Sequence, residues 1–177
     1  MIQKIIKRSI EEYFFVNPSA RLRVREIERT LHLPLPSVIR YCKELLQEGI
    51  LKTVRIGKVM FYTSDRTNEA FLLEKRLFNI RTVHQSGLLE YLKESLNNPA
   101  VVLFGSFGDG EDTEDSDIDL YLETPSKKSI DPAKFEKLLN RKIQLFRYEN
   151  IRKIRNPHLT NNIVNGTPLH KHIEVFS

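Results

Sequence analysis

One segment, residues 100–122, constrains the fold of this chain more than any other. It opens with a continuous apolar run at residues 100–104, which predicts a buried strand, and Gly105-Ser106 follows directly. After a polar spacer, residues 117–122 alternate between polar and apolar side chains. Such alternation is typical of a strand with one buried face. The segment therefore predicts two strands separated by a tight turn and a polar loop.

The second of these strands carries the residues that are candidates for metal binding and catalysis. Asp117 and Asp119 are two positions apart, so on a strand both carboxylates point to the same side. Their oxygens can converge on one hard cation such as Mg²⁺, which prefers one or two carboxylates together with substrate phosphates. Gly105 lets the backbone approach a ligand closely, and Ser106 offers a hydroxyl and a backbone N–H to a phosphate. The pattern therefore predicts a site for a metal ion and a triphosphate.

The spacer between the two strands is strongly acidic. Residues 109–123 contain eight acidic residues and no basic one. Clustered carboxylates repel one another and are tolerated when they are solvated or when a cation lies among them. We expect four of these acids to be solvated loop residues rather than metal ligands: Glu111, Asp112, Glu114 and Asp115.

This segment resembles the signature of the polymerase-beta-like nucleotidyltransferase superfamily: Gly105-Ser106, a spacer, then Asp117-Ile118-Asp119 on a strand that follows an apolar strand. It is most similar to the minimal nucleotidyltransferases, and the likeness covers about residues 88–147. The resemblance implies transfer of a nucleoside monophosphate from a nucleoside triphosphate to an acceptor hydroxyl, with release of pyrophosphate. It also implies that Asp117 and Asp119 are the catalytic carboxylates that hold Mg²⁺ or Mn²⁺, and that Gly105 and Ser106 bind the nucleotide.

The chain departs from the family pattern at two places. Active members usually carry a third carboxylate on a later strand, and on the corresponding strand of this chain, residues 142–146, that position holds Gln144. A neutral amide cannot act as a general base, and it binds a cation more weakly than a carboxylate does. Minimal nucleotidyltransferases also often have a basic residue shortly after Gly-Ser, where this chain has Phe107, Gly108 and Asp109. Whether the domain catalyses transfer or only binds a ligand therefore stays open.

The first third of the chain differs in charge. Residues 1–66 hold 13 Lys and Arg against 7 Asp and Glu, whereas residues 67–177 hold 15 against 16. The apolar spacing predicts three helices and a β-hairpin, at about residues 2–14, 24–31, 36–47, 51–56 and 59–63. This order, together with the basic excess, resembles a winged helix-turn-helix domain and predicts that residues 1–66 bind DNA.

In a winged helix the third helix enters the major groove, and the wing contacts the DNA backbone or the minor groove. Arg40 can donate two hydrogen bonds to a guanine edge, and Ser37 at the start of its helix can bind a phosphate. The residues predicted to contact DNA are Ser37, Arg40, Tyr41, Lys43, Arg55 and Lys58.

The sequence as a whole predicts an α+β protein with a winged helix-turn-helix at 1–66, a connecting helix at 67–85, and a nucleotidyltransferase-fold domain at 86–177 whose mixed sheet is flanked by helices. Cys42 is the only cysteine, which excludes an intrachain disulfide and favours a reducing compartment. No apolar run approaches the roughly 18 residues that indicate a membrane span, so we expect a cytoplasmic protein. His170 and His172 can share a strand face, and the sequence leaves their role open.

Three functions are compatible with these patterns. The first is a DNA-binding nucleotidyltransferase that uses a nucleoside triphosphate and Mg²⁺ or Mn²⁺. The second is a transcriptional regulator whose nucleotidyltransferase-like domain is inactive, because of Gln144, and acts as a ligand sensor or an interaction surface. The third is an antitoxin-type partner of a small helical toxin, with which minimal nucleotidyltransferases often pair. The expected partners are DNA, the nucleotide and a protein, and a homodimer would suit paired DNA half-sites.

Overall fold

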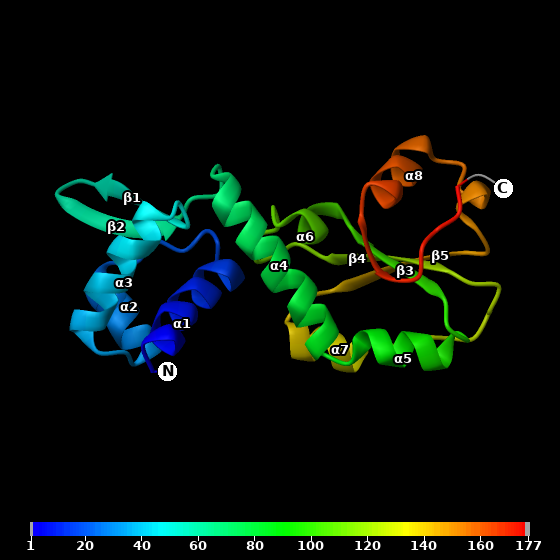
Figure 1. Cartoon of the computed structure of the whole chain (residues 1–177), viewed down its shortest axis with the longest axis horizontal. Helices are drawn as coiled ribbons and strands as arrows, with labels where there is room; N and C mark the ends of the chain where they lie inside the picture. The colour runs from blue at the N-terminus through cyan, green and yellow to red at the C-terminus, as the bar shows by residue number, and fades with distance from the viewer. Residues whose placement is uncertain (1, 176–177) are drawn as a thin grey trace. The chain divides into compact units, whose positions relative to one another are not determined.

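The computed structural model describes residues 2–175. The chain forms two compact units, Met1–Lys75 and Arg76–Ser177. Helix α4 (Glu69–Gln85) passes from the first unit into the second (Figure 1). Within residues 2–175 no helix is both long and apolar enough to cross a membrane. The two units are described in turn.

The first unit contains three helices followed by a two-stranded hairpin. Its elements are α1 (Ile2–Val16), α2 (Val24–Leu31), α3 (Leu35–Gln47), β1 (Leu51–Ile56) and β2 (Val59–Ser64) (Figure 1). The strands are antiparallel and turn at Gly57, whose φ is +61°. Leu22, between α1 and α2, forms an isolated bridge with Tyr62, so a short third segment pairs with the hairpin. The predicted order of helices and strands is thus present.

Helix α3 packs through one apolar stripe. Val38, Cys42 and Leu45 recur at helical spacing and are fully buried, and the helix contacts α1, α2 and β1. Pro36 lies in its first turn, where a missing N–H costs nothing. Burial raises the pKa of the Cys42 thiol to about 12, so the thiol stays protonated and acts as a small apolar side chain.

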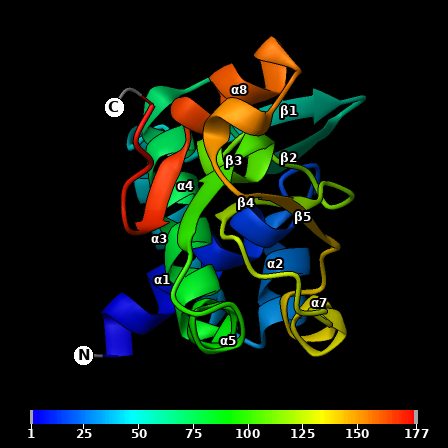
Figure 2. The ribbon, with the colours of Figure 1, turned by 90° about the vertical axis from the view of Figure 1, so that its right-hand side faces the viewer.

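The second unit is built on a four-stranded mixed sheet. Its strands are β3 (Ala100–Phe104), β4 (Ile118–Glu123), β5 (Ile143–Tyr148) and β6 (Thr167–His170), in the order β5-β4-β3-β6. Strand β4 runs antiparallel to β3 and parallel to β5, and β6 pairs antiparallel with β3. The helical elements are α5 (Leu88–Ser95), α7 (Ala133–Leu139) and α8 (Pro157–Val164) (Figure 2), together with α6 (Gly105–Asp109) (Figure 1) and a 3₁₀ turn at Ile151–Lys153.

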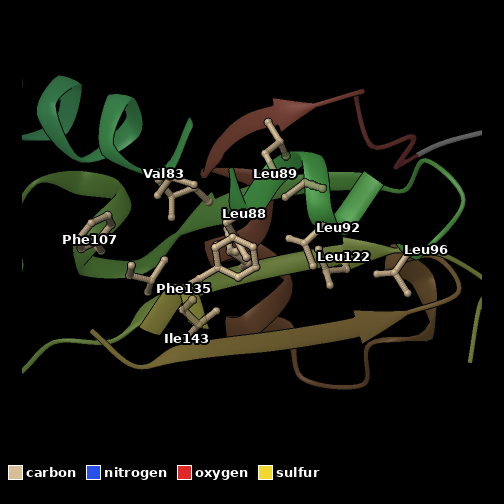
Figure 3. Packing of buried hydrophobic residues seen from close by; sticks show 13 residues of the cluster. Val83, Leu88, Leu89, Leu92, Leu96, Phe107, Leu122, Phe135 and Ile143 are labelled. Carbon is tan, nitrogen blue, oxygen red and sulfur yellow. The ribbon is translucent and has the colours of Figure 1, made fainter. Parts of the chain in front are cut away.

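Both faces of this sheet are covered, which explains the continuous apolar run of β3. On one face, side chains of α4, α5 and α7 pack on alternate residues of β3 and β4 (Figure 3). On the other face, Val102, Phe104 and Tyr121 pack against Ile151 and Ile163, which follow β5 in the chain. A strand buried on both faces reads as an unbroken apolar segment. The predicted α+β architecture with a mixed sheet is therefore confirmed for this unit.

Candidate active site

The two aspartates lie at the edge of the sheet where β4 and β5 begin. Asp117 directly precedes β4, and Asp119 is the second residue of that strand. Asp119 pairs with Phe104 of β3 on one side and with Gln144 of β5 on the other. Residues paired across neighbouring strands share a face, as do residues two apart along a strand. Asp117, Asp119 and Gln144 therefore present their side chains on the same face.

Strand β3 ends at this edge, and Gly105 turns the chain there. Its φ of +71° lies in the left-handed region, and Gly105 and Ser106 form the start of α6. A Cβ added at Gly105 would lie 2.5 Å from Oδ2 of Asp119. Only glycine permits so close an approach, and the structure thus brings the Gly-Ser turn together with the aspartates.

The electrostatics of the site favour a cation. Asp119 is half-buried, and burial raises the pKa of its carboxyl, with the negative charge of Asp117 raising it further. Asp117 and Asp119 are both partly exposed, and their negative charges repel each other at neutral pH. A divalent ion bound by Asp117 and Asp119, the residues on either side of Ile118, would offset this repulsion.

Gln144 occupies the position where the family resemblance expects a third carboxylate. Its register with Asp119 places it on the site face, and its Nε2 donates a hydrogen bond to Oδ2 of Asp117. Across residues 2–175 no group of three His, Cys, Asp or Glu side chains is arranged to hold a metal ion. Mg²⁺ is commonly bound by one or two carboxylates plus waters and substrate phosphates. The residues present therefore fit a metal ion that arrives with a triphosphate.

The acidic loop after α6 contains a residue that the sequence analysis placed wrongly. Asp112 was expected to be solvated, but it is 1% exposed, and so is Asn79 of α4. The side-chain amide of Asn79 donates to Oδ1 of Asp112 and to the carbonyl of Phe107, both at 2.8 Å. The burial of Asp112 could not be recognised from the local sequence, because Asn79, which donates to it, lies 33 residues earlier.

A cavity of about 620 Å³ opens beside Asp117. The loop 114–117 forms one wall, and residues of α7 and the segment 140–142 form the other. Its lining includes three basic side chains, Lys137, Arg141 and Lys142, as well as acidic ones. The cavity is of the size that holds a small ligand, next to one of the candidate metal-binding carboxylates.

The two C-terminal histidines have different surroundings. The ring Nε2 of His170 lies 2.6 Å from Oδ1 of Asn98, and His172 is exposed on the segment that follows β6. Burial and the charges of Lys93 and Lys171 lower the pKa of His170. His170 is therefore a neutral hydrogen-bonding group at neutral pH.

The residues predicted to contact DNA lie on α3 and on the hairpin. Arg40, Lys43, Arg55 and Lys58 are exposed, and Ser37 is partly exposed in the first turn of α3. Arg40 donates through Nε to Oε1 of Glu44 at 2.9 Å, and its guanidinium lies 5.3 Å from the centre of the Tyr41 ring. A contact between Arg40 and a base would therefore compete with an ion pair.

Tyr41 does not have the exposure that a DNA contact needs. It is only 5% exposed. It follows Val38 by three residues and precedes Leu45 by four, so it lies on the buried stripe of α3. Tyr41 was predicted to contact DNA; in the structure it is buried, and the Arg40 guanidinium lies over its ring.

The raised pKa of Asp119 leads to a prediction about stability. A raised pKa means that the folded state favours the protonated form, so the ionised carboxylate lowers stability at neutral pH, and this cost disappears as the pH falls through the raised pKa. We expect Asp119→Asn to raise the Tm at pH 7 by about 2 °C and to leave it unchanged at low pH. Asp115→Asn, at an exposed acid of the same loop, is the control and should change neither value. A lower Tm for Asp119→Asn at pH 7 would contradict the prediction.

Comparison with known proteins identifies the domain that contains this site. Residues 86–170 match the family model described as the nucleotidyltransferase domain. Neither the curated proteins nor the solved structures contain a significant match to the chain. The matched segment begins just before α5 and ends with β6, so it includes the whole mixed sheet, the Gly-Ser turn and both aspartates. Residues 86–170 of this chain are therefore similar to nucleotidyltransferase domains, which supports the resemblance seen in the sequence.

Proposed function

We propose that the chain binds a nucleoside triphosphate with a divalent metal ion and transfers the nucleoside monophosphate to an acceptor hydroxyl, releasing pyrophosphate. The main support is the contact of the Gly105 backbone with the Asp119 carboxylate, which puts a phosphate-binding turn beside a metal-binding side chain. The match of residues 86–170 to nucleotidyltransferase domains supports nucleotidyl transfer as the reaction class.

In this proposal each residue of the site has a defined task. Asp117 and Asp119 would hold Mg²⁺ or Mn²⁺, which when bound offsets the charge that develops on the transferred phosphate. Gly105 admits the triphosphate close to the backbone, and Ser106 binds it through its N–H and hydroxyl. Ser106 is partly exposed, so its hydroxyl can be reached by a phosphate oxygen. Gln144 orients Asp117 but cannot accept the proton of the acceptor hydroxyl.

The direct test is incubation of the folded protein with α-labelled ATP or another labelled nucleoside triphosphate, Mg²⁺ or Mn²⁺, and candidate acceptors. We expect a labelled acceptor and released pyrophosphate in equal amounts, and neither of them when EDTA is added. If no nucleoside triphosphate is bound or consumed by protein whose fold is verified by circular dichroism, the proposal is wrong.

We also propose that residues 1–66 form a winged helix-turn-helix that binds DNA, and that α4, within residues 67–85, connects it to the nucleotidyltransferase domain. Three observations support this. The unit has three helices followed by a hairpin, the Leu22–Tyr62 bridge adds a segment to that hairpin, and the segment carries the whole basic excess of the chain. Arg55 and Lys58 are exposed near the hairpin turn, where a wing contacts the DNA backbone.

The DNA-binding proposal predicts a change in salt dependence. The variant Arg55→Ala with Lys58→Ala removes two phosphate contacts, so the slope of log K against log [salt] should fall in magnitude by about two and the affinity at 0.1 M salt should drop about tenfold. Fluorescence anisotropy with labelled genomic fragments measures both values. The control, Lys127→Ala with Lys128→Ala, removes two exposed lysines of the second unit and should leave both unchanged. Equal effects of the two variants would contradict a role for the hairpin.

A second candidate function is favoured by the bond between Gln144 and Asp117. In this alternative the domain binds a nucleotide but does not catalyse transfer, and the chain is a DNA-binding regulator that responds to the ligand. It predicts metal-dependent nucleotide binding without pyrophosphate release, together with a DNA affinity that changes when the nucleotide is added. The two candidates are therefore separated by measuring binding and turnover on the same sample.

A further inference from the structure

We infer that Asn79 is a positioning residue of the nucleotide site, which holds the Gly105-Ser106 turn in the shape that receives the triphosphate. Asn79 belongs to α4 and precedes the segment matched by the nucleotidyltransferase family, residues 86–170. The nucleotide site of this chain is in that case completed by a residue from outside the family domain. The inference rests on the proposed binding of a nucleoside triphosphate at the turn.

The hydrogen bonds of Asn79 join α4 to the middle of α6 and to the loop that follows α6. Its Nδ2 atom carries two hydrogens, and its two acceptors are the carbonyl oxygen of Phe107 and Oδ1 of Asp112, each at 2.8 Å. The carbonyl of Ser106 in turn accepts hydrogen bonds from the backbone N–H groups of Glu111, at 2.9 Å, and Asp112, at 3.2 Å. Asn79 is thereby linked through Asp112 to the residue that we propose binds a phosphate.

The turn needs such support because its own segment is weakly held. Helix α6 spans only Gly105–Asp109, and a helix of this length is not stable on its own. Its first residue, Gly105, has a φ of +71°, and the residue that follows the helix, Gly110, has a φ of +78°. The loop that follows is acidic, so repulsion among its carboxylates tends to pull it away from Asp117 and Asp119. A buried amide that binds both the helix and the loop opposes this tendency.

The burial of Asp112 makes its bond to Asn79 important. Asp112 is 1% exposed, and a buried carboxylate requires hydrogen-bond donors to offset its desolvation. One turn before Asn79 on the same helix, Arg76 donates from Nη2 to Oγ1 of Thr167 at 2.8 Å. Thr167 pairs with Leu103 of β3, the strand that leads into Gly105. Helix α4 thus supports the strand that enters the turn as well as the turn itself.

The test compares nucleotide affinity among variants at equal folded fraction. Asn79→Ala removes both donated hydrogen bonds. Asn79→Asp keeps the shape of the side chain but places a carboxylate, which cannot donate, against Asp112 and the carbonyl of Phe107. We expect each to raise the Kd for Mg²⁺-ATP about tenfold or more, measured by isothermal titration calorimetry. Asp112→Ala should have a similar effect. The double variant Asn79→Ala with Asp112→Ala should bind about as weakly as the worse single variant, because both changes break the same link.

The matched control is Thr124→Val, which removes a buried hydroxyl that donates to the carbonyl of Leu96 at 3.1 Å. Thr124 follows the last residue of β4, at the opposite end of that strand from Asp119, so Thr124→Val should lower the Tm but leave the Kd unchanged. If Asn79→Ala does not fold, Asp112→Ala tests the same link. Hydrogen exchange of the α6 amides should then be faster in Asp112→Ala than in the unmodified protein.

The outcomes separate the inference from the proposed function. If the unmodified protein binds no nucleoside triphosphate with Mg²⁺, the proposed function fails and the inference fails with it. If the unmodified protein binds the nucleotide and the folded Asn79 and Asp112 variants bind as tightly as Thr124→Val, only the inference is overturned. If the effects of Asn79→Ala and Asp112→Ala add fully in the double variant, the two residues do not act through one link, and the positioning role is wrong.

Discussion

Replacing Asp117 and Asp119 together with alanine is expected to abolish metal-dependent nucleotide binding, with a loss of affinity on the order of 100-fold or more. These are the two carboxylates that share the site face, and Asp119 lies directly beside the Gly105 turn that we propose binds the triphosphate. The variant should remain folded and should be somewhat more stable at neutral pH, because the repulsion that raises the pKa of Asp119 is removed. Titration of ATP with and without Mg²⁺ measures the affinity.

The matched control for this variant is Asp109→Ala with Asp115→Ala. Both residues are exposed acids of the same region, so the control removes the same amount of negative charge near the site without removing a proposed ligand. A general change in electrostatics would act on both variants and would raise rather than lower the affinity for an anionic nucleotide. Retention of Mg²⁺-dependent binding in the Asp117 and Asp119 variant would show that the metal is held elsewhere.

The second large effect is expected from Gln144→Glu, which should increase the rate of nucleotidyl transfer by about 100-fold. Gln144 lies opposite Asp119 on β5, on the site face, and it donates to Asp117. A glutamate of the same length supplies a third carboxylate that can bind a cation and accept the proton of an acceptor hydroxyl. It also replaces an attractive contact with Asp117 by a repulsive one, so the protein without metal should lose stability and regain it when Mg²⁺ is added.

Gln144→Ala separates the two consequences of this change, because it removes the hydrogen bond to Asp117 without adding a charge. We expect Gln144→Ala to bind Mg²⁺-ATP and to show no increase in turnover. Steady-state release of pyrophosphate gives the rate, and thermal melts at several Mg²⁺ concentrations give the stability. If Gln144→Glu binds the nucleotide but transfers no faster than the unmodified protein, the missing carboxylate is not what limits turnover, and the regulator function is favoured.

Much of the second unit could be predicted because its signals are local. The apolar run of residues 100–104 and the alternation after Asp117 became β3 and β4, and Gly105 turns the chain directly after β3 as predicted, whereas the short helix α6 that begins there was not predicted. Gln144 lies beside Asp119, at the position that the family resemblance assigns to a third carboxylate. What could not be predicted is which polar residues are buried. In the sequence Asp112 is one of several neighbouring acidic residues, yet in the structure it is buried and accepts a hydrogen bond from Asn79 of α4.

The first unit illustrates the same limit on a single helix. The stripe of Val38, Cys42 and Leu45 was readable from helical spacing and is buried. Tyr41 was predicted to contact DNA, but its position between Val38 and Leu45 brings it into the core, and the Arg40 guanidinium lies over its ring. The width of a buried stripe depends on which helices pack against it, here α1 and α2, and periodicity alone does not define that width.

The local parts of this protein could be read from its amino-acid sequence: the strand and helix periods, the glycine that turns the chain at residue 105, and the pair of aspartates on one side of a strand. These are properties of the backbone and of neighbouring residues, so no distant contact is needed to read them. Three features depend on the tertiary fold: the hydrogen bonds of Asn79 to Phe107 and Asp112, the burial of Asp112, and the bond between Gln144 and Asp117. Those contacts join residues 27 to 33 positions apart, and packing of one element on another sets them.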